Sequence, residues 1–128
     1  MHITSNKGEI AVLSVELEAN KRGCIISHPS NQHSRYDLII DDGKRLLRTQ
    51  VKYLNRKGNR KNCLELIISG GTKKIKRYTS KEIDLLLIYV PQKNCILCLR
   101  PTQFNNKNTF FFHMENKNTP SYYENFLW

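Results

Sequence analysis

The sequence predicts an α/β protein in which one long helix packs on a β-sheet. Near the N-terminus, residues 7–22 carry apolar side chains at the three- and four-residue spacing of a helix. Short runs of β-branched and apolar residues follow, and residues 83–90 form a near-continuous apolar run. A chain of 128 residues is long enough for one hydrophobic core and too short for two, so we expect a single domain over residues 1–128.

The helix should occupy residues 7–22. Ser5 or Asn6 is a candidate N-cap, because these side-chain oxygens accept hydrogen bonds from the free N–H groups of a first turn. Gly23 suits the position just past the end of the helix. The face that we expect to pack on the sheet consists of Ile10, Leu13 and Leu17, widened by Ala11, Val12 and Val15.

Residues 36–40 and 44–53 should form a β-hairpin, because Asp41-Asp42-Gly43 supplies the left-handed position that a tight turn needs. We expect residues 63–69 to add a third antiparallel strand and residues 83–90 to be buried in the centre of the sheet. Further strands are predicted at residues 24–27, 95–100 and 109–114, polar connections at 28–34, 55–62 and 101–105, a break at 70–72, and turns at 79–82 and 91–94. The tail should contain a short amphipathic helix that docks on the body or on another subunit, so residues 115–128 are a candidate oligomerisation segment.

The net charge of +10 is concentrated in one third of the chain. Twelve basic residues and one acidic residue lie between Lys44 and Arg77, whereas the rest of the chain has a net charge of −1. Such a cluster is either a solvated face or a surface for a polyanion, and we favour a nucleic acid because the amphipathic apolar face of a membrane partner is missing. The candidate DNA-binding residues are Lys44, Arg45, Arg48, Arg56, Lys57, Arg60, Lys61, Lys73, Lys74, Lys76 and Arg77.

The polar side chains of the predicted hairpin are candidates for catalysis. Gln50 and Lys52 are two residues apart, so they share one face of their strand, and Asp37 lies on the neighbouring strand. A hard-cation ligand beside a lysine suits phosphodiester chemistry, in which Mg²⁺ and a positive charge stabilise the charge that develops on phosphorus. The alternative is an exposed polar face. Glu9 and Glu16, two turns apart at the edge of the apolar helix face, are either further site residues or solvated.

The cysteines and histidines give weaker signals. We expect the four cysteines to be reduced, because no apolar run of eighteen residues and no export signal is present, which indicates a cytoplasmic protein. Cys95 and Cys98 have the spacing of zinc ligands, but in a strand residues three apart face opposite sides, so we interpret them as structural thiols. His28 and His33 lie in a polar connection, and we interpret both as loop residues, with phosphate contact as an alternative.

Several short motifs occur in a fixed order along the chain: Lys7-Gly8-Glu9-Ile10-Ala11, Gly23 with the following strand and His28-Pro29, Tyr36-Asp37-Leu38-Ile39-Ile40, Gln50-Val51-Lys52, Tyr78 with Glu82-Ile83-Asp84, and Tyr89-Val90-Pro91. Together they resemble the PD-(D/E)XK nuclease superfamily, within which the QVK variant is similar to small bacterial group I intron homing endonucleases. The resemblance implies a restriction-endonuclease-like α/β core, a mixed β-sheet flanked by helices, and Mg²⁺-dependent hydrolysis of DNA.

The resemblance also implies roles for particular residues. Asp37 is then the central metal ligand, Gln50 stands in place of the usual second acid, Lys52 is the motif lysine and Glu9 is the helical acid. Gln50 departs from the usual pattern, because an amide oxygen binds Mg²⁺ without adding negative charge. With the Val51 backbone carbonyl as a further ligand, these residues form the expected metal site.

We therefore expect a homing-type endonuclease that acts on double-stranded DNA. A long duplex target needs more surface than one small domain exposes, which favours a homo-oligomer, either a dimer or a tetramer. The sequence leaves two alternatives open: a Holliday-junction resolvase or restriction-type nuclease of the same fold, and a non-catalytic nucleic-acid-binding protein with a decayed site.

Overall fold

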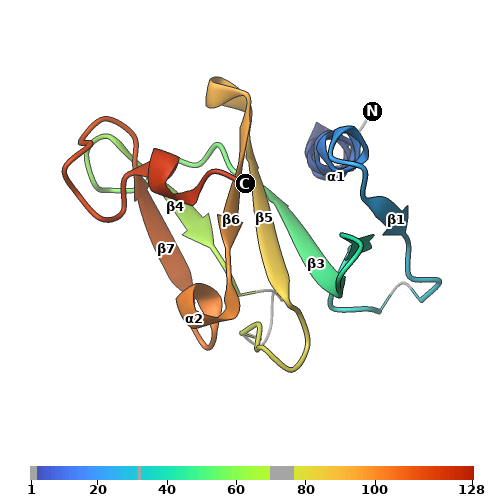
Figure 1. Cartoon of the computed structure of the whole chain (residues 1–128). Helices are drawn as coiled ribbons and strands as arrows, with labels where there is room; N and C mark the ends of the chain where they lie inside the picture. Colours follow the sequence, from blue (N-terminus) through green and yellow to red (C-terminus); the bar gives the residue numbers. More distant parts are fainter. Residues whose placement is uncertain (1–2, 32, 70–76) are drawn as a thin grey trace.

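The computed structural model describes residues 3–31, 33–69 and 77–128, and places them in three layers (Figure 1). A five-stranded sheet with the order β1-β2-β3-β5-β6 lies between helix α1 and a two-stranded sheet, β4-β7. The elements of the large sheet are β1 (Ile25–Ser27), β2 (Leu38–Asp41), β3 (Leu46–Tyr53), β5 (Leu85–Val90) and β6 (Cys95–Leu99). The others are α1 (Ile3–Lys21), β4 (Cys63–Ile67), η1 (Pro91–Lys93), α2 (Pro101–Phe104), β7 (Thr109–His113) and η2 (Tyr123–Phe126).

Helix α1 begins earlier than the sequence indicated. Ser5 and Asn6 lie inside the helix, so the expectation that one of them is the N-cap is wrong. The end agrees with the expectation, because Gly23 has φ +78°, which favours glycine. The Cys24 backbone N–H donates to the carbonyl of Ala19 (2.9 Å), which closes the last turn. No described helix is long and apolar enough to cross a lipid bilayer.

Only part of the predicted face of α1 packs on the sheet: Ala11 and Val15 are buried as expected, whereas Ile10, Leu13 and Leu17 are not. Ala11, Val15 and Ala19 are at most 1% exposed, whereas Ile10, Leu13 and Leu17 are 45%, 62% and 59% exposed. Both sets have helical spacing, so periodicity alone does not choose between them. The set with the smaller side chains is buried, which lets the helix lie close to the strands.

The central hairpin forms as the sequence predicted. β2 and β3 are antiparallel, with Leu38 opposite Thr49 and Asp41 opposite Leu46. Gly43 has φ +88°, and Oδ1 of Asp42 accepts the backbone N–H groups of the two residues after Gly43. The turn is therefore fixed by local chemistry that can be recognised in the sequence.

Strand β5 is the buried central strand that the apolar run predicted. It pairs in parallel with β3 and antiparallel with β6, so the large sheet is mixed. Leu86 and Ile88 pack in the core below the small sheet, while Leu85 and Leu87 pack under α1. Burial on both faces explains why the run lacks the alternation of a strand with one solvated face.

Strand β4 exists, but it is not the third strand of the hairpin sheet. It pairs antiparallel with β7, from Cys63 opposite His113 to Ile67 opposite Thr109. The edge of β3 that β4 was expected to occupy is taken by β5. The expectation of a neighbouring antiparallel strand was wrong because this pairing is decided by residues that are distant in sequence.

The C-terminal third of the chain differs from the sequence-based expectation in two places. Residues 101–104, expected as a polar connection, form the short helix α2, whose Phe104 is fully buried. The tail forms the 3₁₀ turn η2 in place of an α-helix. It docks on the body of the same chain. The centre of the Phe126 ring lies 5.3 Å from the ring centres of Phe110 and Phe112, and the backbone N–H of Trp128 donates to the Ile96 carbonyl (2.9 Å).

The cysteines agree with the expectation of reduced thiols, because all four are free. Cys95 packs against the core beneath the small sheet, and Cys98 against the core beneath α1, so their side chains face opposite sides of β6. Two thiols on opposite faces of a strand do not bind one metal ion together.

The assignment of the α1 face can be tested by two substitutions on the same helix. Ala11→Leu should lower the free energy of unfolding by about 1–3 kcal/mol, because the added atoms overpack the contact between helix and sheet. Leu17→Ala, on the exposed face, should change it by less than about 0.5 kcal/mol. Urea unfolding followed by circular dichroism measures both, and the opposite ranking would contradict the assignment.

Candidate active site

Strands β2 and β3 separate at one point, and Asp37 lies there. The register ends with Leu38 opposite Thr49, and the Asp37 N–H donates to the Thr49 carbonyl (2.9 Å). Strand β3 continues to Tyr53 without β2 beside it. There, Oδ2 of Asp37 accepts the backbone N–H of Val51 (3.0 Å). A carboxylate from the residue before β2 thus pairs with an edge of β3 that β2 leaves open.

The backbone of β3 turns alternate residues toward its two neighbours. The N–H of Leu54 donates to the carbonyl of Tyr89 (2.9 Å), so the even-numbered residues bond toward β5. Thr49 and Val51 bond toward Asp37 instead. Because the N–H and C=O of one strand residue point to the same neighbouring strand, the Val51 carbonyl is also directed to the side of Asp37.

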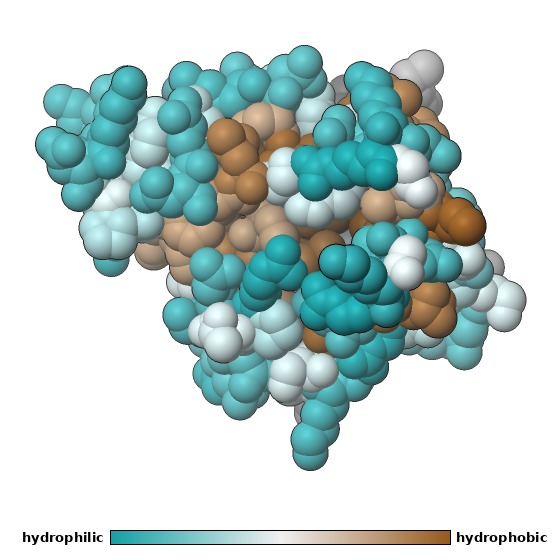
Figure 2. Space-filling view, in the orientation of Figure 1, coloured by the Kyte–Doolittle hydropathy of each residue, from teal (hydrophilic) through white to brown (hydrophobic). Residues whose placement is uncertain are grey.

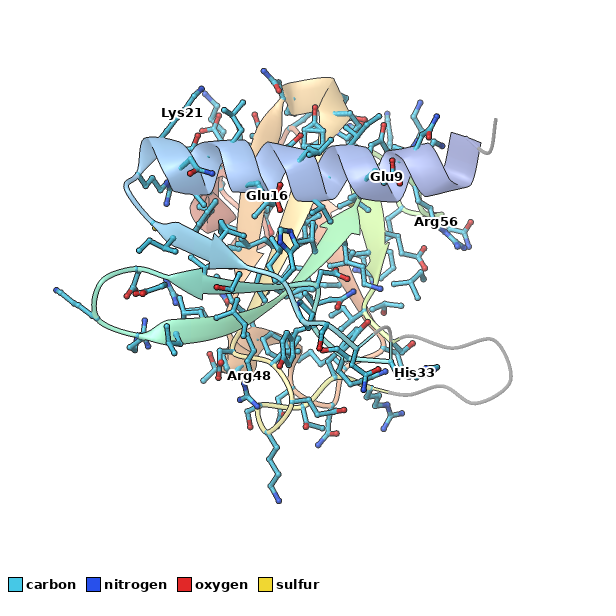
Figure 3. The ribbon with its side chains drawn as sticks, turned by 90° about the vertical axis from the view of Figure 1, so that its right-hand side faces the viewer. Glu9, Glu16, Lys21, His33, Arg48 and Arg56 are labelled. Carbon is cyan, nitrogen blue, oxygen red and sulfur yellow. The ribbon has the colours of Figure 1, made fainter. Side chains whose placement is uncertain are left out.

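A cleft of about 650 Å³ opens at this point between α1 and the strands. Its walls carry Gly8, Glu9, Val12, Leu13, Glu16, His28, Asp37, Gln50 and Val51. Figure 3 shows Glu9 and Glu16 along α1, above the strands. The structure therefore brings Glu9, Asp37, Gln50 and Val51, four of the predicted site residues, to one cavity.

Lys52 is not on the wall of this cleft. It shares a side of β3 with Gln50, and its Nζ lies 5.4 Å from the centre of the Tyr78 ring. The Arg35 guanidinium lies over the same ring, at 4.2 Å, and pairs with Oε2 of Glu82 (3.0 Å). Lys52 thus projects from a half-buried position, held beside an aromatic ring.

Burial raises the pKa of Asp37 and lowers the pKa of Lys52, so the two values approach each other. Burial raises the pKa of the Asp37 carboxyl, and the Val51 N–H and the charge of Lys52 oppose this only in part. Burial also lowers the pKa of Lys52, against the opposing charge of Asp37, and the nearby Arg35 lowers it further. A lysine that loses its proton more readily is suited to accept one from water.

Sequence reasoning did not assign the pair formed by Glu16 and His28. Nε2 of His28 contacts Oε1 of Glu16, and both residues line the cleft. The seven-residue spacing of Glu9 and Glu16 was the available signal for the glutamate. The His28-Pro29 motif and the polar connection draw attention to the histidine, but its contact with Glu16 is not local and could not be foreseen. His33 is exposed and does not line this cleft.

The basic residues divide into exposed ones and ones held within the chain. Arg48 binds Asp84 through two nitrogens (3.0 and 2.9 Å) and donates to the Lys81 carbonyl (2.6 Å), so its guanidinium has a structural role. Nε of Arg77 donates to Asn108 (2.8 Å). Arg77 is nevertheless exposed, and the other exposed candidates are Lys44, Arg45, Arg56, Lys57, Arg60 and Lys61. Lys73, Lys74 and Lys76, and the predicted break at residues 70–72, lie outside the described residues.

The exposed cations between β3 and β4 lie on a strongly hydrophilic part of the surface. Figure 2 shows this hydrophilic region at the upper left, over the loops that flank β4 and β7. Residues 55–62 form one of these loops, and Arg60 lies over the Phe111 ring at 4.2 Å. None of these cations is among the described residues that line the cleft.

The donors around the cleft suit a hard cation. Glu9 and Asp37 offer carboxylates, Gln50 an amide oxygen and Val51 a carbonyl, and oxygen ligands of this kind are those that Mg²⁺ prefers. Within residues 3–31, 33–69 and 77–128, no three histidine, cysteine, aspartate or glutamate side chains converge as a metal site. A metal here would therefore depend on the neutral oxygens as well as on the two acids.

Comparison with known proteins gives two findings. The model of a PD-(D/E)XK endonuclease family matches residues 2–122. The fold is similar to the structure of a bacterial homing endonuclease, I-Ssp6803I, with a TM-score of 0.79 and 20% identity over 97% of this chain and 88% of that one. This likeness shows a restriction-endonuclease-like fold, as the sequence predicted. No curated protein matches the sequence.

Asp37 and Asp84 have pKa values shifted in opposite directions, so replacing each with asparagine should change the stability of the protein in opposite directions. Burial raises the pKa of Asp37 above its ordinary 3.8, so the unfolded chain ionises first and folding becomes less favourable as pH rises through this range. The bond to Arg48 lowers the pKa of Asp84, so its contribution to stability appears as pH rises and is lost as pH falls. Asp37→Asn should therefore stabilise the protein at pH 7, and Asp84→Asn should destabilise it.

Thermal unfolding in EDTA at about pH 3 and pH 7 measures these effects, because both carboxyls are largely protonated in the unfolded chain at the lower pH. Both differences from the parent should shrink toward pH 3. A destabilised Asp37→Asn variant at pH 7 would show that the Asp37 carboxylate stabilises the fold, contrary to this argument.

Proposed function

Because this chain belongs to the PD-(D/E)XK endonuclease family, we propose that it is a site-specific, homing-type endonuclease that hydrolyses double-stranded DNA with Mg²⁺. The observation that carries the proposal is the meeting of Asp37, the Val51 backbone and Gln50 on one cleft, with Lys52 next along the same strand. The likeness to a homing endonuclease supports the homing type over the other nucleases of this family. We expect the protein to act in the cytoplasm.

Four oxygen donors would hold the cation: the carboxylates of Asp37 and Glu9, the Gln50 side chain and the Val51 carbonyl. When bound, Mg²⁺ supplies positive charge that offsets the charge developing on the scissile phosphate. The Val51 N–H fixes one oxygen of Asp37, which leaves the other carboxylate oxygen for the ion. Since Gln50 is neutral, we expect weaker ion binding than in a site with a third carboxylate.

Lys52 accepts the proton of the attacking water in this proposal. Its lowered pKa favours the neutral amine that a base requires, and the charge of Asp37 keeps the ammonium stable once it has formed. The Tyr78 ring restricts where the Lys52 amine lies. The same charge then offsets the negative charge of the transition state.

The exposed basic residues between β3 and β4 would contact the DNA backbone. Arg56, Lys57, Arg60 and Lys61 lie in or beside one loop that carries no acidic residue. Phosphate contacts of this kind position a duplex without reading its sequence. We also propose that the protein acts as a homo-oligomer, because one chain of this size covers only part of a long target. Residues 115–128 remain a candidate contact between subunits.

The catalytic assignment predicts the effect of two substitutions. Asp37→Ala and Lys52→Ala should each reduce Mg²⁺-dependent cleavage of supercoiled plasmid, or of an intron-insertion-site duplex, by at least about 100-fold. Each removes a group that stabilises the transition state or moves a proton. Lys93→Ala, at an exposed lysine that does not line the cleft, should cleave like the parent. Parental rates in both site variants would contradict the assignment.

The choice of substrate is tested beside this assay. A homing-type enzyme should cut the linear duplex at one site, whereas a junction resolvase should prefer a four-way branched duplex of the same sequence. A protein that binds both and cuts neither, with and without Mg²⁺, would support the non-catalytic alternative.

The basic loop predicts a change in the salt dependence of binding. Arg56→Gln and Lys57→Gln should each make the plot of log binding constant against log salt concentration less steep, by about 1 in the magnitude of its slope. The reason is that each substitution removes one phosphate contact. Lys21→Gln is the matched control, since Figure 3 shows Lys21 and Arg56 on opposite sides of the molecule. Fluorescence anisotropy with labelled duplex in EDTA measures the slope, and an unchanged slope in the loop variants would contradict the loop's role.

A further inference from the structure

Glu16 and His28 form a carboxylate–imidazole pair beside the candidate active site, and the roles proposed above do not use it. Nε2 of His28 contacts Oε1 of Glu16. His28 directly follows β1, whose last residue, Ser27, pairs with Ile39 of β2, so the chain leaves β1 close to where Asp37 enters β2. Both members of the pair line the cleft that Asp37 lines.

With the carboxylates of the cleft ionised, His28 is the one described lining residue whose protonated side chain can act as a general acid. The side chains of Glu9, Glu16 and Asp37 are acceptors, Gln50 carries an amide, and the other described lining residues are apolar or glycine. The His28 side chain is 61% exposed, whereas that of Glu16 is 21% exposed. The imidazole therefore reaches the open cleft while the carboxylate behind it is largely covered.

We propose that His28 is the general acid of the reaction, oriented by Glu16. This inference rests on the proposed nuclease function. As the water oxygen bonds to phosphorus, Lys52 takes the proton of the water, and the bond from phosphorus to the leaving oxygen breaks with its electron pair on that oxygen. Nδ1 of the His28 imidazolium gives that oxygen a proton; afterwards Lys52 releases its proton to solvent and solvent returns one to His28.

The arrangement favours proton transfer over simple binding of a phosphate. Nε2 faces Glu16, so Nδ1 is the nitrogen left for the substrate, and a carboxylate on the far nitrogen fixes the orientation of an imidazole. A cation that binds phosphate is strongest when no carboxylate opposes its charge. Here Glu16 offsets the charge of the imidazolium, and no lysine or arginine is among the described residues that line the cleft.

A sulfur substitution in the substrate separates these roles. Two duplexes carry the cleavage site mapped in the plasmid assay, one with the normal leaving oxygen and one with sulfur in its place at the scissile bond. A thiolate leaves without a proton because a thiol is a stronger acid than an alcohol. Single-turnover rates are compared for the parent and each variant, with Mn²⁺ added for both duplexes.

His28→Ala should slow cleavage of the oxygen substrate by roughly 10²–10⁴-fold and that of the sulfur substrate by less than about threefold. Glu16→Gln, which keeps the size of the side chain, should give a smaller loss with the same rescue by sulfur. Lys52→Ala should slow both substrates. His33→Ala is the matched control, an exposed histidine that does not line the cleft, and should match the parent on both.

Two results would overturn the inference while the proposed function stands: His28→Ala cleaves the oxygen substrate normally, or it slows both substrates equally, as loss of a phosphate contact would. If Asp37→Ala and Lys52→Ala also cleave normally, the proposed function fails. Far-ultraviolet circular dichroism checks that each variant is folded. Because His28 is exposed, its replacement should leave the fold intact.

Discussion

The hydrogen bond from the Val51 backbone N–H to the Asp37 carboxylate is the interaction on which the candidate site depends. It forms because β3 runs past the end of its pairing with β2, which leaves backbone groups that need partners. Asp37 supplies one partner and is thereby held in a half-buried position. Burial there raises the pKa of Asp37, and the burial of Lys52 on the same strand lowers the pKa of that lysine. The gap in the ladder thus sets the position and the electrostatics of Asp37.

Helix α1 contributes to the core and to the cleft at once. Ala11 and Val15 are buried against the sheet, and Glu9 and Glu16, on an adjacent part of the helix surface, reach the cleft. Small buried side chains allow the helix to lie close to the strands. The distance of the two acids from Asp37 is thus set by the packing of residues that have no chemical role.

The sequence predicted what local chemistry decides. The hairpin follows from the turn at Gly43, the buried strand from its apolar run, and the opposite orientations of Cys95 and Cys98 from the strand period. It placed Ala11 and Val15 on the buried stripe of α1 but also Ile10, Leu13 and Leu17, which are exposed, because the whole stripe shares one periodicity. It did not predict the partner of β4, because that pairing joins residues about 45 positions apart. The contact of His28 with Glu16 was missed for the same reason, since it forms only when α1 lies over the end of β1.

The parallel pairing of β3 with β5 also determines when a growing chain can become active. A parallel partner cannot come from a tight turn, so β3 waits for Leu85–Val90, more than thirty residues later. During synthesis, the strand that carries Gln50 and Lys52 has an open side until about two thirds of the chain has left the ribosome. A nascent hairpin alone therefore lacks the support that holds its lysine and amide, and the candidate site is complete only when the core is nearly complete.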